Sequence, residues 1–103
     1  MLSIQEQQIV VDAIKPYHPI QIGVFGSVAR GDDQKDSDVD IAYSLDDRFR
    51  FSLFDLGDLM DDLEAKLHRK IDLVSFDAMS PLLKKSILKD MIYIFNGTIC
   101  YSQ

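Results

Sequence analysis

The stretch that decides the fold reads IQIGVFGSVARGDDQKDSDVDIAYS and covers residues 20–44. Its opening is rich in β-branched residues, which predicts a buried strand that ends at Gly26-Ser27. A polar loop follows, and residues 38–44 then alternate between large apolar side chains and smaller, mostly polar ones. Because successive side chains of a strand point to opposite faces, the apolar residues share one face and Asp38 and Asp40 share the other. The stretch therefore predicts two strands, the second of which carries two carboxylates on one side.

Periodicity and capping residues predict further elements on both sides of this stretch. Helices are expected over residues 4–14, 53–67 and 81–89, with a strand over 71–74 and a hairpin over 91–101 that turns at Asn96-Gly97. The predicted order is helix, strand, strand, helix, strand, helix, hairpin, within a single domain over residues 1–103. We therefore expect an α/β (α+β) fold in which a small mixed β-sheet has helices packed on one face. The other face would be available for chemistry.

Composition limits the classes of function. The chain has 103 residues, of which 17 are acidic and 11 are basic, so that its formal net charge is −6. This acidic balance disfavours direct binding of nucleic acid. Cys100 is the only cysteine, which excludes an internal disulfide and suits the reducing cytoplasm. No signal peptide is evident, and no stretch approaches the ~18–20 apolar residues that a membrane-spanning helix needs.

Three carboxylates are the candidate metal ligands. Asp38 and Asp40 leave the same face of one strand, and Asp72 lies between the apolar residues Ile71 and Leu73 of another. If the two strands are neighbours, all three carboxylates converge. Oxygen ligands suit Mg²⁺, and three carboxylates could hold two ions. A solvated acidic loop explains these three residues poorly, because they lie in apolar strands.

The Gly26-Ser27 turn is a candidate phosphate site. Glycine allows the backbone to approach a phosphate closely, and the N–H groups of a tight turn before a helix at Val28 would bind an anion. The Ser27 hydroxyl adds a donor. Arg30 either contacts the phosphate or braces the loop through Asp36 or Asp38.

Taken together, these residues resemble the motif of the DNA polymerase β-like nucleotidyltransferase superfamily. The match consists of Gly26-Ser27, ten intervening residues, and then Asp38-Val39-Asp40. The fuller run from Gly26 to Gly31 is similar to the minimal branch of the superfamily, and Asp72 matches its third carboxylate. The resemblance implies a polymerase β-like fold, with two Mg²⁺ ions on the three aspartates.

The resemblance also implies a function. It places ATP against Gly26, Ser27 and Arg30, and it implies that AMP is transferred with release of pyrophosphate. Minimal nucleotidyltransferases are typically antitoxins that are encoded beside a HEPN-domain ribonuclease toxin and transfer AMP to a tyrosine of that toxin. Two alternatives stay open: an antitoxin that acts by binding alone, and a transferase that acts on a small molecule or tRNA.

Other side chains have more ordinary interpretations. An EF-hand beginning at Asp36 is disfavoured, because its sixth position would be Ile41 rather than glycine. A role in core or partner contacts is favoured over adenine stacking for Phe49, Phe51 and Phe54. His68 is expected at a helix C-terminus, and a solvated helix face is expected for Lys84, Lys85 and Lys89.

Overall fold

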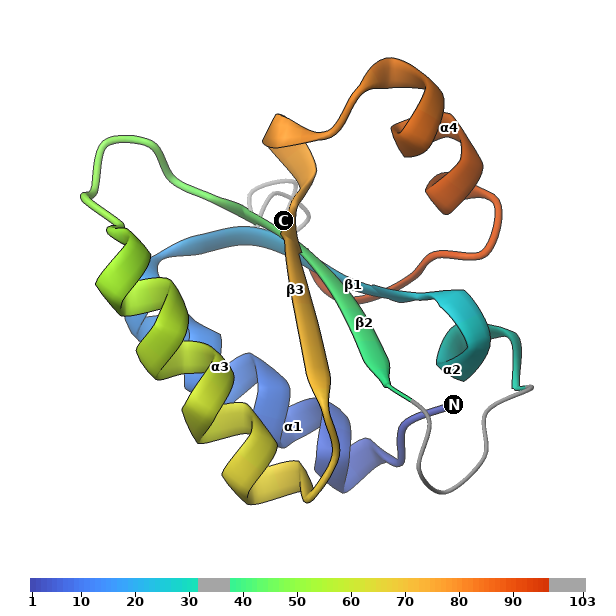
Figure 1. Cartoon of the computed structure of the whole chain (residues 1–103), viewed down its shortest axis with the longest axis horizontal. Helices are drawn as coiled ribbons and strands as arrows, with labels where there is room; N and C mark the ends of the chain where they lie inside the picture. Colours follow the sequence, from blue (N-terminus) through green and yellow to red (C-terminus); the bar gives the residue numbers. More distant parts are fainter. Residues whose placement is uncertain (32–37, 97–103) are drawn as a thin grey trace, which may run out of the picture.

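The computed structural model describes residues 1–31 and 38–96, and these residues form a mixed four-stranded sheet (Figure 1). The strands are β1 (Pro19–Phe25), β2 (Val39–Leu45), β3 (Ile71–Ser75) and β4 (Ile92–Asn96). Their order across the sheet is β3-β2-β1-β4. β1 is antiparallel to both β2 and β4, whereas β2 and β3 are parallel. The expected mixed sheet is therefore confirmed, with β2 as a central strand.

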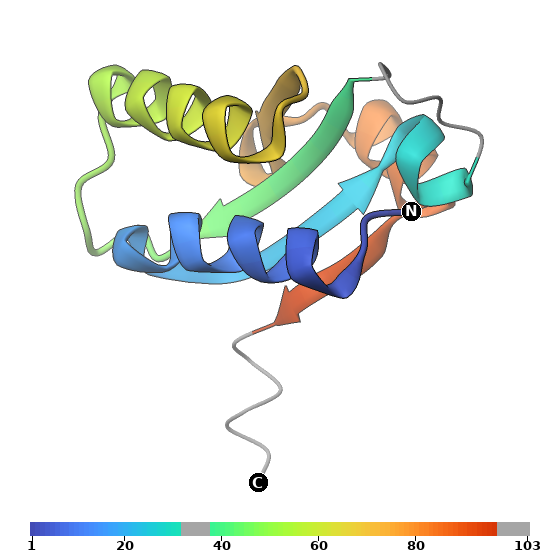
Figure 2. The same cartoon turned by 90° about the horizontal axis from the view of Figure 1, so that it is seen from below.

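Two long helices lie on one face of this sheet, as Figures 1 and 2 show. The helices are α1 (Ile4–Ile14), α2 (Gly26–Arg30), α3 (Leu53–Leu67) and α4 (Pro81–Leu88), with short 3₁₀ turns η1 (Lys15–Tyr17) and η2 (Phe76–Ala78). α1 and α3 run across the same face, whereas α2 follows the end of β1. In the described ranges, none of the helices has the length and apolar character needed to cross a membrane.

The predicted helix starts are confirmed by their caps. The Ser3 hydroxyl accepts a hydrogen bond from the Glu6 backbone N–H at 3.1 Å, and the Glu6 carboxylate accepts one from the Ser3 N–H at 3.0 Å. Ser52 and Asp55 form the same reciprocal box at the start of α3. Ser80 caps α4, which has proline in its first turn. Each cap satisfies backbone donors that have no partner inside the helix.

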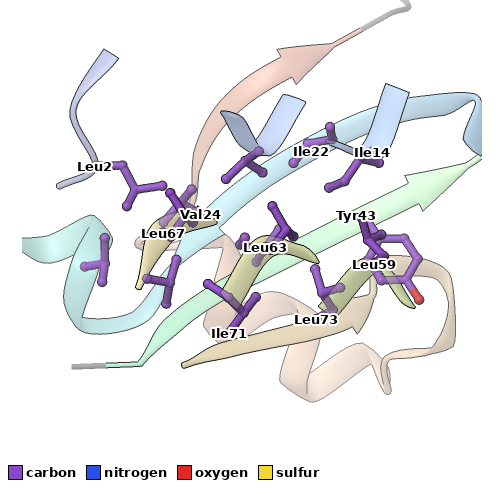
Figure 3. Close-up of a cluster of buried hydrophobic side chains, with 14 residues drawn as sticks. Leu2, Ile14, Ile22, Val24, Tyr43, Leu59, Leu63, Leu67, Ile71 and Leu73 are labelled. Carbon is purple, nitrogen blue, oxygen red and sulfur yellow. The ribbon is translucent and has the colours of Figure 1, made fainter. Parts of the chain in front are cut away.

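The main core lies between the sheet and the helices α1 and α3 (Figure 3). Alternate residues of β1, β2 and β3 point into it, and the aliphatic stripe of α3 covers them. Full burial of one such side chain stabilises the fold by about 1.5–3 kcal/mol. The fully buried members include Val10, Ile14, Ile22, Val24, Val39, Ile41 and Leu63. This packing fixes which side chains of the strands face the opposite side.

The opposite face is only partly covered. A small cluster of Ala42, Met79 and Ile87 packs there, beneath α4. β3 and β4 lie at opposite edges of the sheet, so the connection between them has to cross one face, and α1 and α3 already occupy the other. The expectation of helices on one face thus holds for the long pair, while α4 takes part of the face that we expected to be free.

The C-terminal hairpin is described only in its first half. β4 pairs with β1 along the edge of the sheet, from Gln21 opposite Asn96 to Val24 opposite Ile92. The predicted turn at Asn96-Gly97, its returning strand and Cys100 extend beyond the described residues.

Candidate active site

Asp40 and Asp72 lie side by side in the sheet. β2 and β3 are parallel neighbours, and Asp40 is the register partner of Asp72. Adjacent strands are about 4.7–4.9 Å apart, so the two side chains leave the sheet as neighbours. The residues on either side of each aspartate are buried in the main core, which turns both carboxylates to the other face. The shared face is the one that the sequence pattern predicted, and the two strands are the neighbours that the convergence of the carboxylates required.

Asp38 completes an electrostatically coupled group. It is exposed and immediately precedes β2. The pKa of Asp40 is raised above its ordinary value by burial, and further by the negative charges of Asp72 and Asp38. The nearby positive charge of Arg30 opposes this rise. The three carboxylates are therefore close enough to repel one another, as like charges on one face should.

The Gly26 backbone is packed directly against the Asp40 carboxylate. Phe25, the last residue of β1, is the register partner of Asp40, which brings the following turn over that side chain. A Cβ atom at Gly26 would overlap Asp40 Oδ2 and lie 3.3 Å from Asp40 Cγ. Gly26 also has a φ of 76°, in the left-handed region that side chains disfavour. Glycine is thus required here for both space and backbone conformation.

The turn leads straight into α2. The helix begins at Gly26, two residues earlier than predicted, and ends at Arg30, with Gly31 as its C-cap at a φ of 79°. Ser27 is half-buried in its first turn. The first N–H groups of a helix have no partner within it, so donors lie next to the carboxylate group. This arrangement places potential phosphate ligands and acidic side chains on the same corner of the sheet.

Arg30 forms an ion pair that the sequence did not indicate. Its guanidinium donates to Asp90 at 3.2 Å, and both side chains are partly exposed. Sixty positions separate the two residues, and no local pattern predicts their contact. Of the predicted braces, Asp36 lies outside the described residues. This ion pair joins the segment after α4, which contains Asp90, to the end of α2. It holds the Arg30 guanidinium in the neighbourhood of Asp40.

The remaining candidates are placed as follows. Phe51 packs on the core and makes edge contacts with Tyr17 and Tyr43 at ring-centroid distances of 5.1 and 5.9 Å, which confirms its structural role. Phe49 stacks on His18 instead, at 3.6 Å between ring centroids. Phe54 is 86% exposed on α3.

The remaining charged candidates lie at the end of α3 and in or next to α4. His68 is the C-terminal cap of α3 with a left-handed φ of 56°, at the helix end where it was expected. The Lys84 ammonium lies 4.8 Å from the centre of the Phe76 ring. Lys85 and Lys89 are exposed.

The donor set is suited to a hard cation. The candidate metal ligands at this corner are carboxylate oxygens, and Mg²⁺ prefers such oxygens together with the phosphates of a substrate. The pKa of Asp40 is raised first by burial and then by repulsion from Asp72 and Asp38, and a cation between the carboxylates would offset that repulsion. Among residues 1–31 and 38–96, no three acidic, histidine or cysteine side chains already surround one point as a complete ligand set. The residues thus fit Mg²⁺ chemically, in a site that substrate phosphates would complete.

A mixed sheet with paired aspartates on adjacent strands, next to a glycine-serine turn, defines the class of nucleotidyltransferases. Residues 8–98 match the model of the family Polymerase beta, Nucleotidyltransferase, and the chain belongs to this family. The protein adenylyltransferase MntA of Thermococcus cleftensis is 32% identical over 99 residues, with 91% of this chain and 98% of the relative covered. The chain is therefore a nucleotidyltransferase and a homologue of a protein adenylyltransferase.

Solved structures confirm the polymerase β-like fold. A toxin–antitoxin structure with AMP-PNP superposes with a TM-score of 0.77 and 21% identity, covering 87% of this chain and 73% of that one. A tri-AMPylated Shewanella oneidensis HEPN toxin in complex with its MNT antitoxin gives a TM-score of 0.72 and 17% identity, covering 95% and 76%. At these identities the likeness concerns the fold.

Proposed function

We propose that the chain is an antitoxin that transfers AMP from ATP to a tyrosine of a HEPN-domain ribonuclease toxin in the cytoplasm, and so inactivates it. The Thermococcus relative is a protein adenylyltransferase, and the similar structures contain AMP-PNP or an AMPylated HEPN toxin. The observation that carries the proposal is the pairing of Asp40 with Asp72 beneath the Gly26 turn. This corner combines a group of carboxylates with N–H and hydroxyl groups that can donate hydrogen bonds to phosphate, as nucleotidyl transfer requires.

The first role is to bind the nucleotide. We assign the triphosphate to the backbone N–H groups and hydroxyl of Gly26-Ser27, with the Arg30 guanidinium close by. Asp38, Asp40 and Asp72 would hold two Mg²⁺ ions. When bound, Mg²⁺ supplies positive charge against the triphosphate and lowers the pKa of a coordinated hydroxyl. The half-buried position of Asp40 strengthens its electrostatic interactions relative to those in bulk water.

The second role is to orient the reaction. The tyrosine oxygen of the acceptor attacks the α-phosphorus, a new phosphorus–oxygen bond forms, and the bond to the leaving pyrophosphate breaks. Asp72 is exposed on the edge strand β3, where an acceptor protein can reach it. We assign Asp72 as the group that accepts the hydroxyl proton. Catalysis then depends mainly on positioning and charge neutralisation.

A transfer assay tests this function. The protein is incubated with α-labelled ATP, Mg²⁺ and the product of the adjacent reading frame, and the labelled tyrosine is located by peptide mass spectrometry. Asp40→Asn should abolish labelling, whereas Asp58→Asn, which removes the same charge from the exposed side of α3, should not. Label on RNA or a small molecule, or inhibition of the partner without label, would contradict the proposal and support one of the two alternatives.

A further inference from the structure

A cavity of about 280 Å³ lies at the other end of β2 and β3 from the carboxylate group. Tyr43 and Ser75 line it as register partners, three positions along the strands from Asp40 and Asp72. At about 3.3 Å per residue, the two pairs are roughly 10 Å apart along the strands, and the odd spacing turns Tyr43 to the face of the main core, opposite to Asp40. The loop between β2 and α3 folds back to form the opposite wall, which includes Phe49. The cavity is thus distinct from the candidate active site but close to it.

Tyr43 points a polar atom into this cavity. Its side chain is 7% exposed, and the ring packs against Phe51. Figure 3 shows its oxygen at the margin of the core cluster, directed away from the aliphatic side chains. Within residues 1–31 and 38–96, the hydroxyl makes no hydrogen bond, and it is not sealed from solvent. The hydroxyl of a buried tyrosine usually has a hydrogen-bond partner. Because the Tyr43 hydroxyl has none among the described residues, it is available to a ligand.

Three carboxylates surround the same cavity. Asp46 is already neutralised, because the Arg48 guanidinium donates to both of its oxygens at 3.0 and 3.1 Å. Asp77 accepts a hydrogen bond from the Ser44 hydroxyl at 2.8 Å. In the described part of the chain, neither Asp47 nor Asp77 has a cation within ion-pair distance. The cavity therefore carries two uncompensated negative charges and favours a cation.

The aromatic walls indicate which kind of cation fits. Phe49 and Phe51 line the cavity, and Phe49 is held flat against His18 with an angle of 16° between the rings. A guanidinium is planar and weakly hydrated, so it stacks on aromatic rings and donates in pairs to carboxylates, whereas an ammonium is a compact, strongly hydrated charge. The volume lies just below the ~300–1,000 Å³ typical of pockets for drug-sized ligands. The cavity therefore suits one amino-acid side chain better than a whole nucleotide.

We infer that this cavity binds the guanidinium group of an arginine side chain of the acceptor protein. Asp47 and Asp77 accept hydrogen bonds from its N–H groups, and the Tyr43 hydroxyl lies at its edge. The phenylalanine rings stack against its flat face. That the arginine belongs to the acceptor rests on the proposed function, because a protein substrate must dock within reach of Asp40 and Asp72. Binding of a guanidinium does not rest on it.

The first test uses neither ATP nor Mg²⁺, so that it is independent of catalysis. N-acetyl-arginine amide is titrated into the ¹⁵N-labelled protein, with the neutral N-acetyl-citrulline amide and the N-acetyl-lysine amide as comparisons. We expect saturable shifts of the amide signals around Asp47 and Asp77 with the arginine probe alone. Equal shifts with citrulline or lysine, shifts elsewhere, or displacement of the probe by adenosine would overturn the inference.

Matched variants separate this site from general charge. Asp47→Asn combined with Asp77→Asn should weaken binding of the probe about ten-fold or more, since charge-assisted hydrogen bonds are lost. Tyr43→Phe should weaken it less, and Asp61→Asn on α3 should leave it unchanged. The affinity for the acceptor protein, measured by calorimetry without ATP, should fall in the same order. An acceptor affinity that the double substitution leaves unchanged would refute the assigned source of the arginine, whatever the transfer assay shows.

Discussion

The substitution Gly26→Ala tests the geometry of the candidate active site most sharply. Its added methyl group would overlap Asp40 Oδ2 and lie 3.3 Å from Asp40 Cγ, so the carboxylate has to turn away. A non-glycine residue in the left-handed region costs about 1–2 kcal/mol. The free energy of unfolding should fall by about that amount, because the half-buried Asp40 side chain can rotate toward solvent. The Asp40 carboxylate, however, would no longer lie beside Asp72.

Gly31→Ala is the matched control. Gly31 has nearly the same backbone conformation, with a φ of 79°, but a Cβ atom there meets nothing within 4 Å. It should therefore lose the same ~1–2 kcal/mol without moving a carboxylate. Urea unfolding gives both free energies, and calorimetry with Mg²⁺ and a non-hydrolysable ATP analogue gives the affinities.

The two variants should differ in function and not in stability. A misplacement of about 1 Å can lower a rate about 100-fold, so we expect a loss of AMP transfer on that scale in Gly26→Ala and near-normal transfer in Gly31→Ala. The reasoning is refuted if Gly26→Ala binds the nucleotide and transfers AMP normally, or if Gly31→Ala loses both to the same extent.

Three further predictions follow from the described residues. Gly57→Ala, inside α3 with open space around the added methyl group, should raise the free energy of unfolding by up to ~1 kcal/mol in urea titrations; a loss would contradict the packing of this helix. Asp40→Asn should raise the melting temperature without Mg²⁺, because it removes a repelled carboxylate, and should abolish further stabilisation by Mg²⁺-nucleotide; a lower melting temperature would argue against repulsion. Burial raises the pKa of Tyr43, so the unfolded chain loses its phenolic proton first and stability should decline as pH rises above about 10; Tyr43→Phe should show a shallower decline in alkaline melting curves, and an unchanged slope would speak against burial as its cause.

Local patterns were sufficient to predict the elements and the acidic group. Ser3 and Ser52 mark helix starts because their caps involve residues only three positions away. Asp40 and Asp72 could be placed on one face because strand alternation is strict and the residues that flank them are apolar. The prediction that these carboxylates converge assumed that their strands are neighbours. The parallel register of β2 and β3 then pairs Asp40 with Asp72.

Contacts between distant segments could not be predicted in the same way. The ion pair between Arg30 and Asp90 depends on how α4 crosses the sheet, which follows from the strand order and not from any short motif. The cavity next to Tyr43 forms only when the loop after β2 folds back over the end of β3. The first residue of α2, Gly26, likewise lies against Asp40, which belongs to β2 and is distant in the sequence.

Paramagnetic NMR with Mn²⁺ in place of Mg²⁺ locates the metal site directly. In the presence of a non-hydrolysable ATP analogue, amide signals of residues next to Asp38, Asp40 and Asp72 should broaden first, and Asp40→Asn should remove the effect. Broadening centred on Asp47 and Asp77, or broadening around Asp40 that survives the substitution, would contradict an active site built on the paired aspartates of β2 and β3.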